Sequence, residues 1–143
     1  MSIESVFGAL NKGGVRYLLV GGMAGILHGV PRTTIDIDIA IDPSRANLKK
    51  CISALKGIGM GSDTEFIDEI LGQGGITFEN DIAVDVITDL PKGEDFGKLW
   101  NGKRMVEYQG TKITLIAKRD LRRLLTKAGR RQDVEDLEYL KGR

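Results

Sequence analysis

The sequence predicts a single α+β domain, and three observations support this. Its 143 residues are the length of one typical domain. Its composition, 41% hydrophobic, 29% charged and 6% aromatic, is that of a globular chain and not of a disordered one. Segments with the two-residue periodicity of strands also alternate with segments of helical periodicity, and 19 glycines indicate many tight turns.

The first elements are predicted from caps and glycine breaks. Ser2–Asn11 has apolar residues at helical spacing behind a serine that can cap the helix. Val15–Val20 is rich in branched and aromatic residues and predicts a strand. The pair Gly21-Gly22 is expected to break this strand, and Met23–His28 to form a helix directly after it.

Thr34–Ile41 alternates strictly and predicts a half-buried strand. Its isoleucines share one face: Ile35, Ile37, Ile39 and Ile41. Asp36 and Asp38 therefore share the opposite face. Asp42 is expected to cap the following helix, Arg45–Leu55.

The rest of the chain predicts two hairpins and two helices. The strands of the hairpins are Ile76–Phe78 with Ile82–Thr88, and Arg104–Tyr108 with Lys112–Leu115. The helices are Lys118–Lys127 and Asp133–Leu140, the latter with an apolar stripe of Val134, Leu137 and Leu140. Within the glycine-rich segment Gly57–Gly75, only Phe66–Leu71 suggests order. We expect one domain over residues 1–143, with a catalytic α/β core at 1–116 and C-terminal helices at 117–143.

The net charge of +1 hides an uneven distribution. Residues 101–131 carry 10 basic and 2 acidic side chains, whereas residues 1–100 carry 9 basic and 14 acidic ones. The basic stretch is either a solvated helix face or a phosphate-facing surface beside an acidic site. The overall balance excludes a general nucleic-acid-coating protein.

The sequence predicts a cytoplasmic location without a membrane segment. No apolar run approaches the ~20 residues of a membrane helix, and no N-terminal segment resembles a signal peptide. The single cysteine, Cys51, cannot form an internal disulfide, and it is expected to be a small apolar core residue.

The pair Asp36 and Asp38 is the strongest chemical signal. Residues two apart on a strand face the same way, and two neighbouring carboxylates repel each other unless a cation lies between them. Hard oxygen ligands suit Mg²⁺ or Mn²⁺. The alternative is the solvated edge of an amphipathic strand. Asp85, in the middle of a second alternating strand, favours the metal site because strands seldom contain aspartate.

The turn at Gly21-Gly22 would let a phosphate approach the backbone closely. The pattern is not a P-loop, because no Gly-Lys-Ser/Thr follows. Nor is it a dinucleotide fingerprint, because Val20 occupies the position of its first glycine. We expect His28, in the next helix, to have a structural role.

These residues resemble the nucleotidyltransferase superfamily that includes DNA polymerase beta. The motifs that carry the resemblance are Val20-Gly21-Gly22, Arg32-x-Thr34-x-Asp36-x-Asp38 and Asp85. The segment from Lys127 to Leu137 resembles the tail of minimal members, some of which are similar to abortive-infection toxins of the AbiEii kind. One departure is Gly22: many members have serine there, so a hydroxyl contact to phosphate is missing.

The resemblance implies a nucleotidyltransferase fold, a mixed twisted sheet flanked by helices, and a function. The enzyme would move an NMP from an NTP to an acceptor hydroxyl and release pyrophosphate. Asp36, Asp38 and Asp85 would be catalytic and would hold Mg²⁺ or Mn²⁺. The nucleotide-binding candidates are Gly21, Gly22, Arg32, Thr34, Lys127 and Arg130.

The sequence leaves the acceptor and the partners open. The acceptor is a tRNA, a protein hydroxyl or a small molecule. A non-catalytic nucleotide-binding module of the same fold, or one half of a toxin–antitoxin pair with a cognate antitoxin or toxin protein, is the alternative to an enzyme. A metal-dependent nuclease is a third hypothesis, because paired carboxylates also serve phosphodiester hydrolysis.

Overall fold

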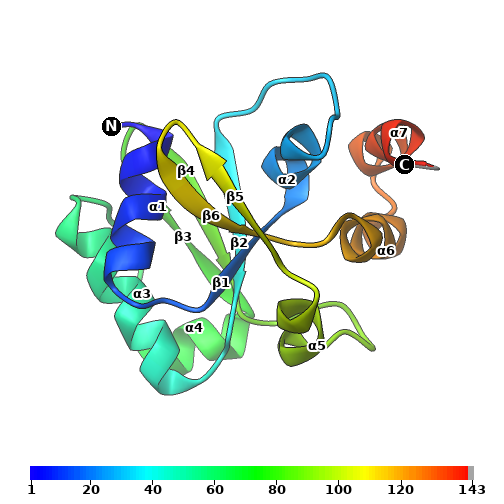
Figure 1. Cartoon of the computed structure of the whole chain (residues 1–143). Coiled ribbons are helices and arrows are strands. Elements are labelled where there is room, and N and C mark those ends of the chain that lie inside the picture. Colours follow the sequence, from blue (N-terminus) through cyan, green and yellow to red (C-terminus); the bar gives the residue numbers. More distant parts are fainter. Residues whose placement is uncertain (142–143) are drawn as a thin grey trace.

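A computed structural model describes residues 1–141 and contains one six-stranded sheet with the order β3-β4-β2-β1-β6-β5 (Figure 1). The strands are β1 (Tyr17–Val20), β2 (Asp36–Ile41), β3 (Gly75–Glu79), β4 (Ala83–Ile87), β5 (Arg104–Tyr108) and β6 (Thr111–Leu115). The helices are α1 (Ile3–Lys12), α2 (Gly21–Leu27), α3 (Arg45–Gly57), α4 (Ile67–Gln73), α5 (Phe96–Asn101), α6 (Lys118–Ala128) and α7 (Arg131–Leu140). The predicted α+β class is confirmed.

The sheet is mixed, as expected. β2 runs antiparallel to β1 and parallel to β4, β1 runs parallel to β6, and the hairpins β3–β4 and β5–β6 close the two edges. Both hairpins predicted from the sequence are present. The parallel β2–β4 pair is central to the site, because it joins two strands that are distant in sequence.

Helices lie on both faces of the sheet. In Figure 1, α1, α3 and α4 lie on one side of the sheet, and α2, α6 and α7 lie on the other side near β1. The side chains of Ile37, Ile39 and Ile41 are buried in the core. Alternation along β2 then turns Asp36 and Asp38 to the opposite face. Cys51 is buried in the core as predicted, and burial raises the pKa of its thiol to about 12.

Several local predictions need correction. β1 ends at Val20, directly before Gly21-Gly22, as predicted, but α2 begins at Gly21 and not at Met23. Ile35 precedes β2 and is 70% exposed, because pairing starts only at Asp36. Ser44, not Asp42, caps α3: its side chain accepts a hydrogen bond from the Asn47 amide.

The C-terminal helices pack against the rest of the chain. Leu121, Leu125 and Leu140 are buried, whereas Val134 of the predicted apolar stripe is exposed. His28 has the structural role expected, since its Nε2 donates to the Ile116 carbonyl at 2.8 Å and so ties α2 to the start of this segment. The last two residues of the predicted helical segment, 142 and 143, lie outside the described residues. In residues 1–141 no helix combines the length and apolar character needed to cross a membrane.

Candidate active site

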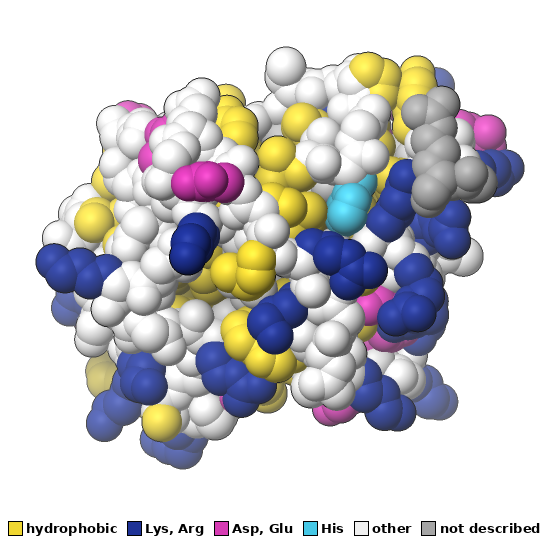
Figure 2. Space-filling view, in the orientation of Figure 1, with side chains coloured by type: hydrophobic (Ala, Val, Ile, Leu, Met, Phe, Trp, Pro, Cys, Tyr) yellow, Lys and Arg dark blue, Asp and Glu magenta, His cyan; other side chains and the backbone are white. Residues whose placement is uncertain are grey.

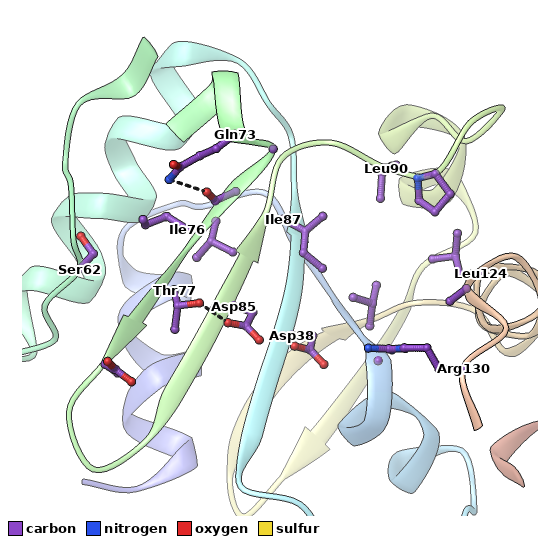
Figure 3. A pocket seen from close by; sticks show the side chains of 18 of the residues that line it. Asp38, Ser62, Gln73, Ile76, Thr77, Asp85, Ile87, Leu90, Leu124 and Arg130 are labelled. Carbon is purple, nitrogen blue, oxygen red and sulfur yellow. Dashed lines mark hydrogen bonds between the residues drawn. The ribbon is translucent and has the colours of Figure 1, made fainter. Parts of the chain in front are cut away.

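Strand register brings the three predicted carboxylates to one face of the sheet. Asp38 of β2 lies directly opposite Asp85 of β4. Asp36 lies two residues earlier on β2, opposite Ala83. Because direct partners on neighbouring strands share a face, the side chains of Asp38 and Asp85 point the same way. Figure 3 shows the two carboxylates side by side. Asp36 is exposed and is not among the residues that line the cleft described below.

The electrostatics at Asp38 favour a cation. Burial, a hydrogen bond with Asp85 and the negative charges of Asp85 and Asp36 raise the pKa of Asp38 to about 6, while Arg130 opposes the shift. A carboxyl so disfavoured as an anion is stabilised when a positive charge lies beside it. A divalent cation bound here would therefore reduce the repulsion between the carboxylates of Asp38, Asp85 and Asp36.

Neighbouring groups fix the orientation of both carboxylates. The Thr77 hydroxyl on β3 donates a hydrogen bond to Asp85 Oδ1, because Thr77 is the direct strand partner of Asp85. On the other side, a Cβ added at Gly21 would overlap Asp38 Oδ2 and lie 3.0 Å from the Asp38 Cγ. Gly21 also has φ +68°, a left-handed conformation that favours glycine. Sequence reasoning identified Gly21 but missed Thr77. Only the pairing register of β3 and β4 shows that Thr77 lies opposite Asp85.

A cleft of about 950 Å³ opens in front of Asp38 and Asp85 (Figure 3). Much of its lining is apolar and comes from β3, β4, the loop after β4 and α6: Ile76, Ile87, Leu90, Pro91, Leu121, Leu124 and Leu125. The charged residues that line it are Asp38, Asp63, Glu79, Asp85 and Arg130. The cleft is large enough for a drug-sized ligand, and polar groups lie among its apolar lining residues.

The carboxylate oxygens of this site are suitable ligands for Mg²⁺ or Mn²⁺, but they do not surround a cation completely. Asp36, Asp38 and Asp85 offer only carboxylate oxygens, the ligands these cations prefer. Within residues 1–141, no three carboxylate, imidazole or thiol side chains already converge as a metal cluster. Since Mg²⁺ usually takes only one or two carboxylates together with waters and substrate phosphates, the pair Asp38 and Asp85 suffices as a protein anchor.

The other predicted nucleotide-binding residues divide into two groups. Gly22 adjoins Gly21, and Arg130 lines the cleft with its side chain 74% exposed. Arg130 also donates from Nε to Asp133 at 2.8 Å, so Asp133 is its partner. Lys127 instead donates to the Lys92 carbonyl at 2.9 Å and forms an ion pair with Glu94.

Arg32 and Thr34 lie outside this cleft. Both line a second, smaller cavity of about 160 Å³ next to α2. The Thr34 hydroxyl accepts a hydrogen bond from the Asp36 amide at 3.1 Å and so orients the start of β2. Arg32 makes a two-pronged ion pair with Asp136, a buried residue of the C-terminal motif to which the sequence analysis gave no role.

The solved structures that align with this chain include nucleotidyltransferases. A Thermotoga maritima protein assigned as a nucleotidyltransferase aligns with a TM-score of 0.69 and 22% identity, over 99% of this chain and 91% of the other. The lincosamide antibiotic adenylyltransferase LnuA, bound to lincomycin, aligns with a TM-score of 0.66 and 19% identity, over 99% and 98%. ANT(2'')-Ia in complex with adenylyl-2''-tobramycin aligns with a TM-score of 0.65 and 15% identity, over 96% and 84%.

These similarities establish the fold, and the predicted nucleotidyltransferase fold is confirmed. No family model and no curated protein matches the sequence.

Proposed function

We propose that this protein is a metal-dependent nucleotidyltransferase that moves an NMP from an NTP to an acceptor hydroxyl. The observation that carries the proposal is the direct pairing of Asp38 with Asp85 beside the Gly21 backbone, in a cleft of about 950 Å³. Repelling carboxylates held against a glycine turn are suited to a cation that carries a triphosphate.

Asp36, Asp38 and Asp85 would hold Mg²⁺ or Mn²⁺, which neutralises charge on the attacking and leaving oxygens. Asp85 accepts the proton of the acceptor hydroxyl, whose oxygen then attacks the α-phosphorus. The bond from the α-phosphorus to the oxygen that joins it to the β-phosphorus breaks, and pyrophosphate leaves with that oxygen. Thr77 holds the Asp85 carboxylate in place for this step, and Arg130 at the cleft rim attracts the phosphates. Lys127 contributes by anchoring the loop beside the cleft.

The cleft favours a small-molecule acceptor over tRNA. Four of its five charged lining residues are acidic, and much of its lining is apolar. Such a surface repels a phosphate backbone and accommodates a neutral or cationic alcohol. Two neighbours of the same fold carry lincomycin and adenylyl-2''-tobramycin, both small-molecule ligands. A protein hydroxyl and a tRNA end remain as outcomes of the experiment.

The test is transfer of label from each of the four α-³²P-labelled NTPs, with Mg²⁺ or Mn²⁺, to a cell extract separated into small molecules, RNA and protein. We expect label in the small-molecule fraction and release of pyrophosphate. Asp38→Asn and Asp85→Asn should abolish transfer, while the matched control Asp81→Asn, at an exposed turn, should retain it. Absence of transfer in every fraction would refute the proposal.

The same assay separates the alternatives. NTP binding by calorimetry without turnover would indicate a non-catalytic module, and RNA or DNA fragments released without NTP would indicate a nuclease. Label on one co-purifying protein would support a toxin–antitoxin pair and the AbiEii-like assignment. A cytoplasmic location is part of the proposal, since NTPs and Mg²⁺ are supplied there.

A further inference from the structure

A second cavity lies apart from the cleft in front of Asp38 and Asp85. It has a volume of about 160 Å³, and none of its lining residues also lines the cleft. Four segments that are distant in sequence meet there: α1, α2, the chain before β2 and the β5–β6 hairpin. Figure 2 shows apolar side chains in the hollow between this hairpin and α2. The cavity is therefore a product of the whole fold and not of one loop.

The lining of this cavity is mostly apolar. Its apolar residues are Ile3, Met23, Ile26, Leu27, Tyr108 and Ile113. Met23 and Ile113 are buried core residues, so the hydrophobic core supports one side of the cavity. Apolar cavities of roughly 150 Å³ hold one molecule of the size of benzene. The volume and the lining therefore favour a single ring or a short branched chain as the apolar part of a ligand.

Hydrogen-bond donors without acceptors lie among these apolar residues. Arg32 donates from Nε and Nη2 to Asp136, and within residues 1–141 its Nη1 makes no hydrogen bond. The Thr34 hydroxyl accepts from the Asp36 amide, and its own proton has no acceptor in the described part of the chain. The same holds for the proton of the Tyr108 hydroxyl. A ligand that offers oxygen acceptors would satisfy these groups.

The charge of the lining selects an anion. Arg32 is the only charged residue among those that line the cavity between residues 1 and 141, and no carboxylate lines it. Asp136 lies outside the lining with its side chain 2% exposed, and it also accepts a hydrogen bond from the Gln132 amide at 2.8 Å. Because arginine has five N–H donors and Asp136 takes two of them, the guanidinium can donate to a second carboxylate.

We propose that this cavity is a second ligand site, which binds a small apolar carboxylic acid of the size of benzoate as its anion. The apolar part of the ligand fills the interior, and its carboxylate accepts hydrogen bonds from Arg32 and from the hydroxyls of Thr34 and Tyr108. The site is independent of the proposed transferase activity, because it shares no lining residue with the cleft. It gives Arg32 and Thr34 a ligand other than the NTP.

The first measurement is a titration of the full chain with benzoate, followed by the backbone amide signals in NMR spectra. We expect a dissociation constant of roughly 1 mM or below, with the largest shifts at Ile26, Leu27 and Thr34. Acetate lacks the ring and benzyl alcohol lacks the charge. Each should bind at least roughly 10-fold more weakly than benzoate, because each loses one of the two features that the cavity recognises.

The second measurement fills the cavity. Ile26→Phe places a larger side chain in the space for the ring and should weaken benzoate binding by at least roughly 10-fold. Ile67→Phe makes the same substitution on α4, which lines neither cavity, and is the matched control. It should leave benzoate affinity unchanged. Thermal melting of both variants identifies any that fails to fold.

The third measurement removes the charge. The double variant Arg32→Gln with Asp136→Asn avoids leaving a buried carboxylate unpaired. It should weaken benzoate binding by roughly 10-fold and leave the affinity for benzyl alcohol unchanged. Tyr108→Phe keeps the ring and removes one donor, so it should weaken benzoate binding by roughly 2- to 10-fold.

Three results would overturn the proposal. They are a wild-type chain that does not bind benzoate, equal affinity for benzoate and benzyl alcohol, and amide shifts confined to the cleft around Asp38 and Asp85. Benzoate affinity that stays at the wild-type value in folded Ile26→Phe protein, or in the folded double variant, would overturn it as well. A protein that binds benzoate in this way but transfers no nucleotide would support this site and refute the transferase proposal.

Discussion

Gly21 shows how one missing Cβ shapes the site. Two independent features require glycine at this position. One is its φ of +68°, and the other is that an added Cβ would overlap Asp38 Oδ2. The first costs an L-residue about 1–2 kcal/mol anywhere in the chain. The second displaces a carboxylate that the proposed chemistry requires. Both demands can be measured separately, because the chain contains a second glycine with the same φ.

We predict that Gly21→Ala destabilises the protein by about 2–4 kcal/mol, combining the strain of a positive φ with overpacking against Asp38. Gly14→Ala is the matched control, since Gly14 also has φ +68° but no atom lies within 4 Å of its added Cβ. It should lose only about 1–2 kcal/mol and keep full activity. Urea denaturation with the transfer assay checks both. Equal effects of the two substitutions would show that Asp38 does not contact position 21.

A second prediction concerns the hydroxyl that orients Asp85. Thr77→Val keeps the shape and the strand preference of the side chain but removes the hydrogen bond to Asp85 Oδ1. We expect the fold to persist and the Mg²⁺ concentration for half-maximal activity to rise several-fold. Titration of transfer activity with Mg²⁺ measures this. Thr111→Val, on β6 far from the cleft lining, is the control and should leave the titration unchanged.

At the scale of elements, the sequence predicted which face of β2 carries the carboxylates, but not which strand would lie beside it. Alternation around Asp36 and Asp38 is a local property and could be read directly. The pairing of Asp38 with Asp85 is tertiary, because two parallel strands are joined only after long intervening segments. The carboxylate set was therefore predictable as a hypothesis. The contact of Thr77 with Asp85 and the contact of Asp136 with Arg32 were not, since both join segments that are distant in sequence.

The arrangement of elements also explains part of the basic stretch, residues 101–131. α6 turns Leu121, Leu124 and Leu125 toward the cleft. Several of its cations are internal partners: Arg123 pairs with Glu94 and Asp120, and Lys127 pairs with Glu94. Figure 2 shows Lys and Arg side chains gathered on the side of the molecule where α6 and α7 lie, with others scattered over the rest of this face. Charge counting could not separate these cations, because partners such as Glu94 come from another segment.

The contact between α6 and the preceding loop predicts acid sensitivity. The side chain of Glu94 is 3% exposed, and hydrogen bonds and ion pairs with Arg123 and Lys127 lower its pKa to about 2. A carboxylate with a depressed pKa in the folded state adds stability above its unfolded pKa of ~4.3 and loses it as the pH falls toward the folded value. We expect the melting temperature to fall between about pH 4.5 and pH 2.

The matched variant is Glu94→Gln, which cannot titrate. It should be less stable than the wild type at pH 7, because it leaves Arg123 and Lys127 without their anionic partner. The stability difference between the two proteins should shrink steadily below pH 4.5. Melting curves for both proteins across this range measure it, and a difference that stays constant with pH would contradict the assigned role of Glu94.

At the scale of the whole molecule, the division into a core at 1–116 and helices at 117–143 remains a prediction about the chain's organisation. The contacts across this boundary are extensive. Ile116, Leu121 and Leu140 are buried, and Arg32–Asp136 and Glu94–Arg123 join the two parts through ion pairs. The apolar lining of the cleft also comes partly from α6. The two segments are therefore expected to be one folding unit.

We predict that full-length protein unfolds in one cooperative transition and that a fragment of residues 1–116 does not fold alone. The fragment would expose the surfaces that Leu121, Leu125 and Leu140 cover and would leave Glu94 without Arg123 and Lys127. At about 2–5 kcal/mol for each large buried aliphatic side chain removed, the loss approaches the whole stability of a small domain. Calorimetry of the full chain and circular dichroism of the fragment test this. A fragment that melts cooperatively would show that residues 1–116 fold without the C-terminal helices.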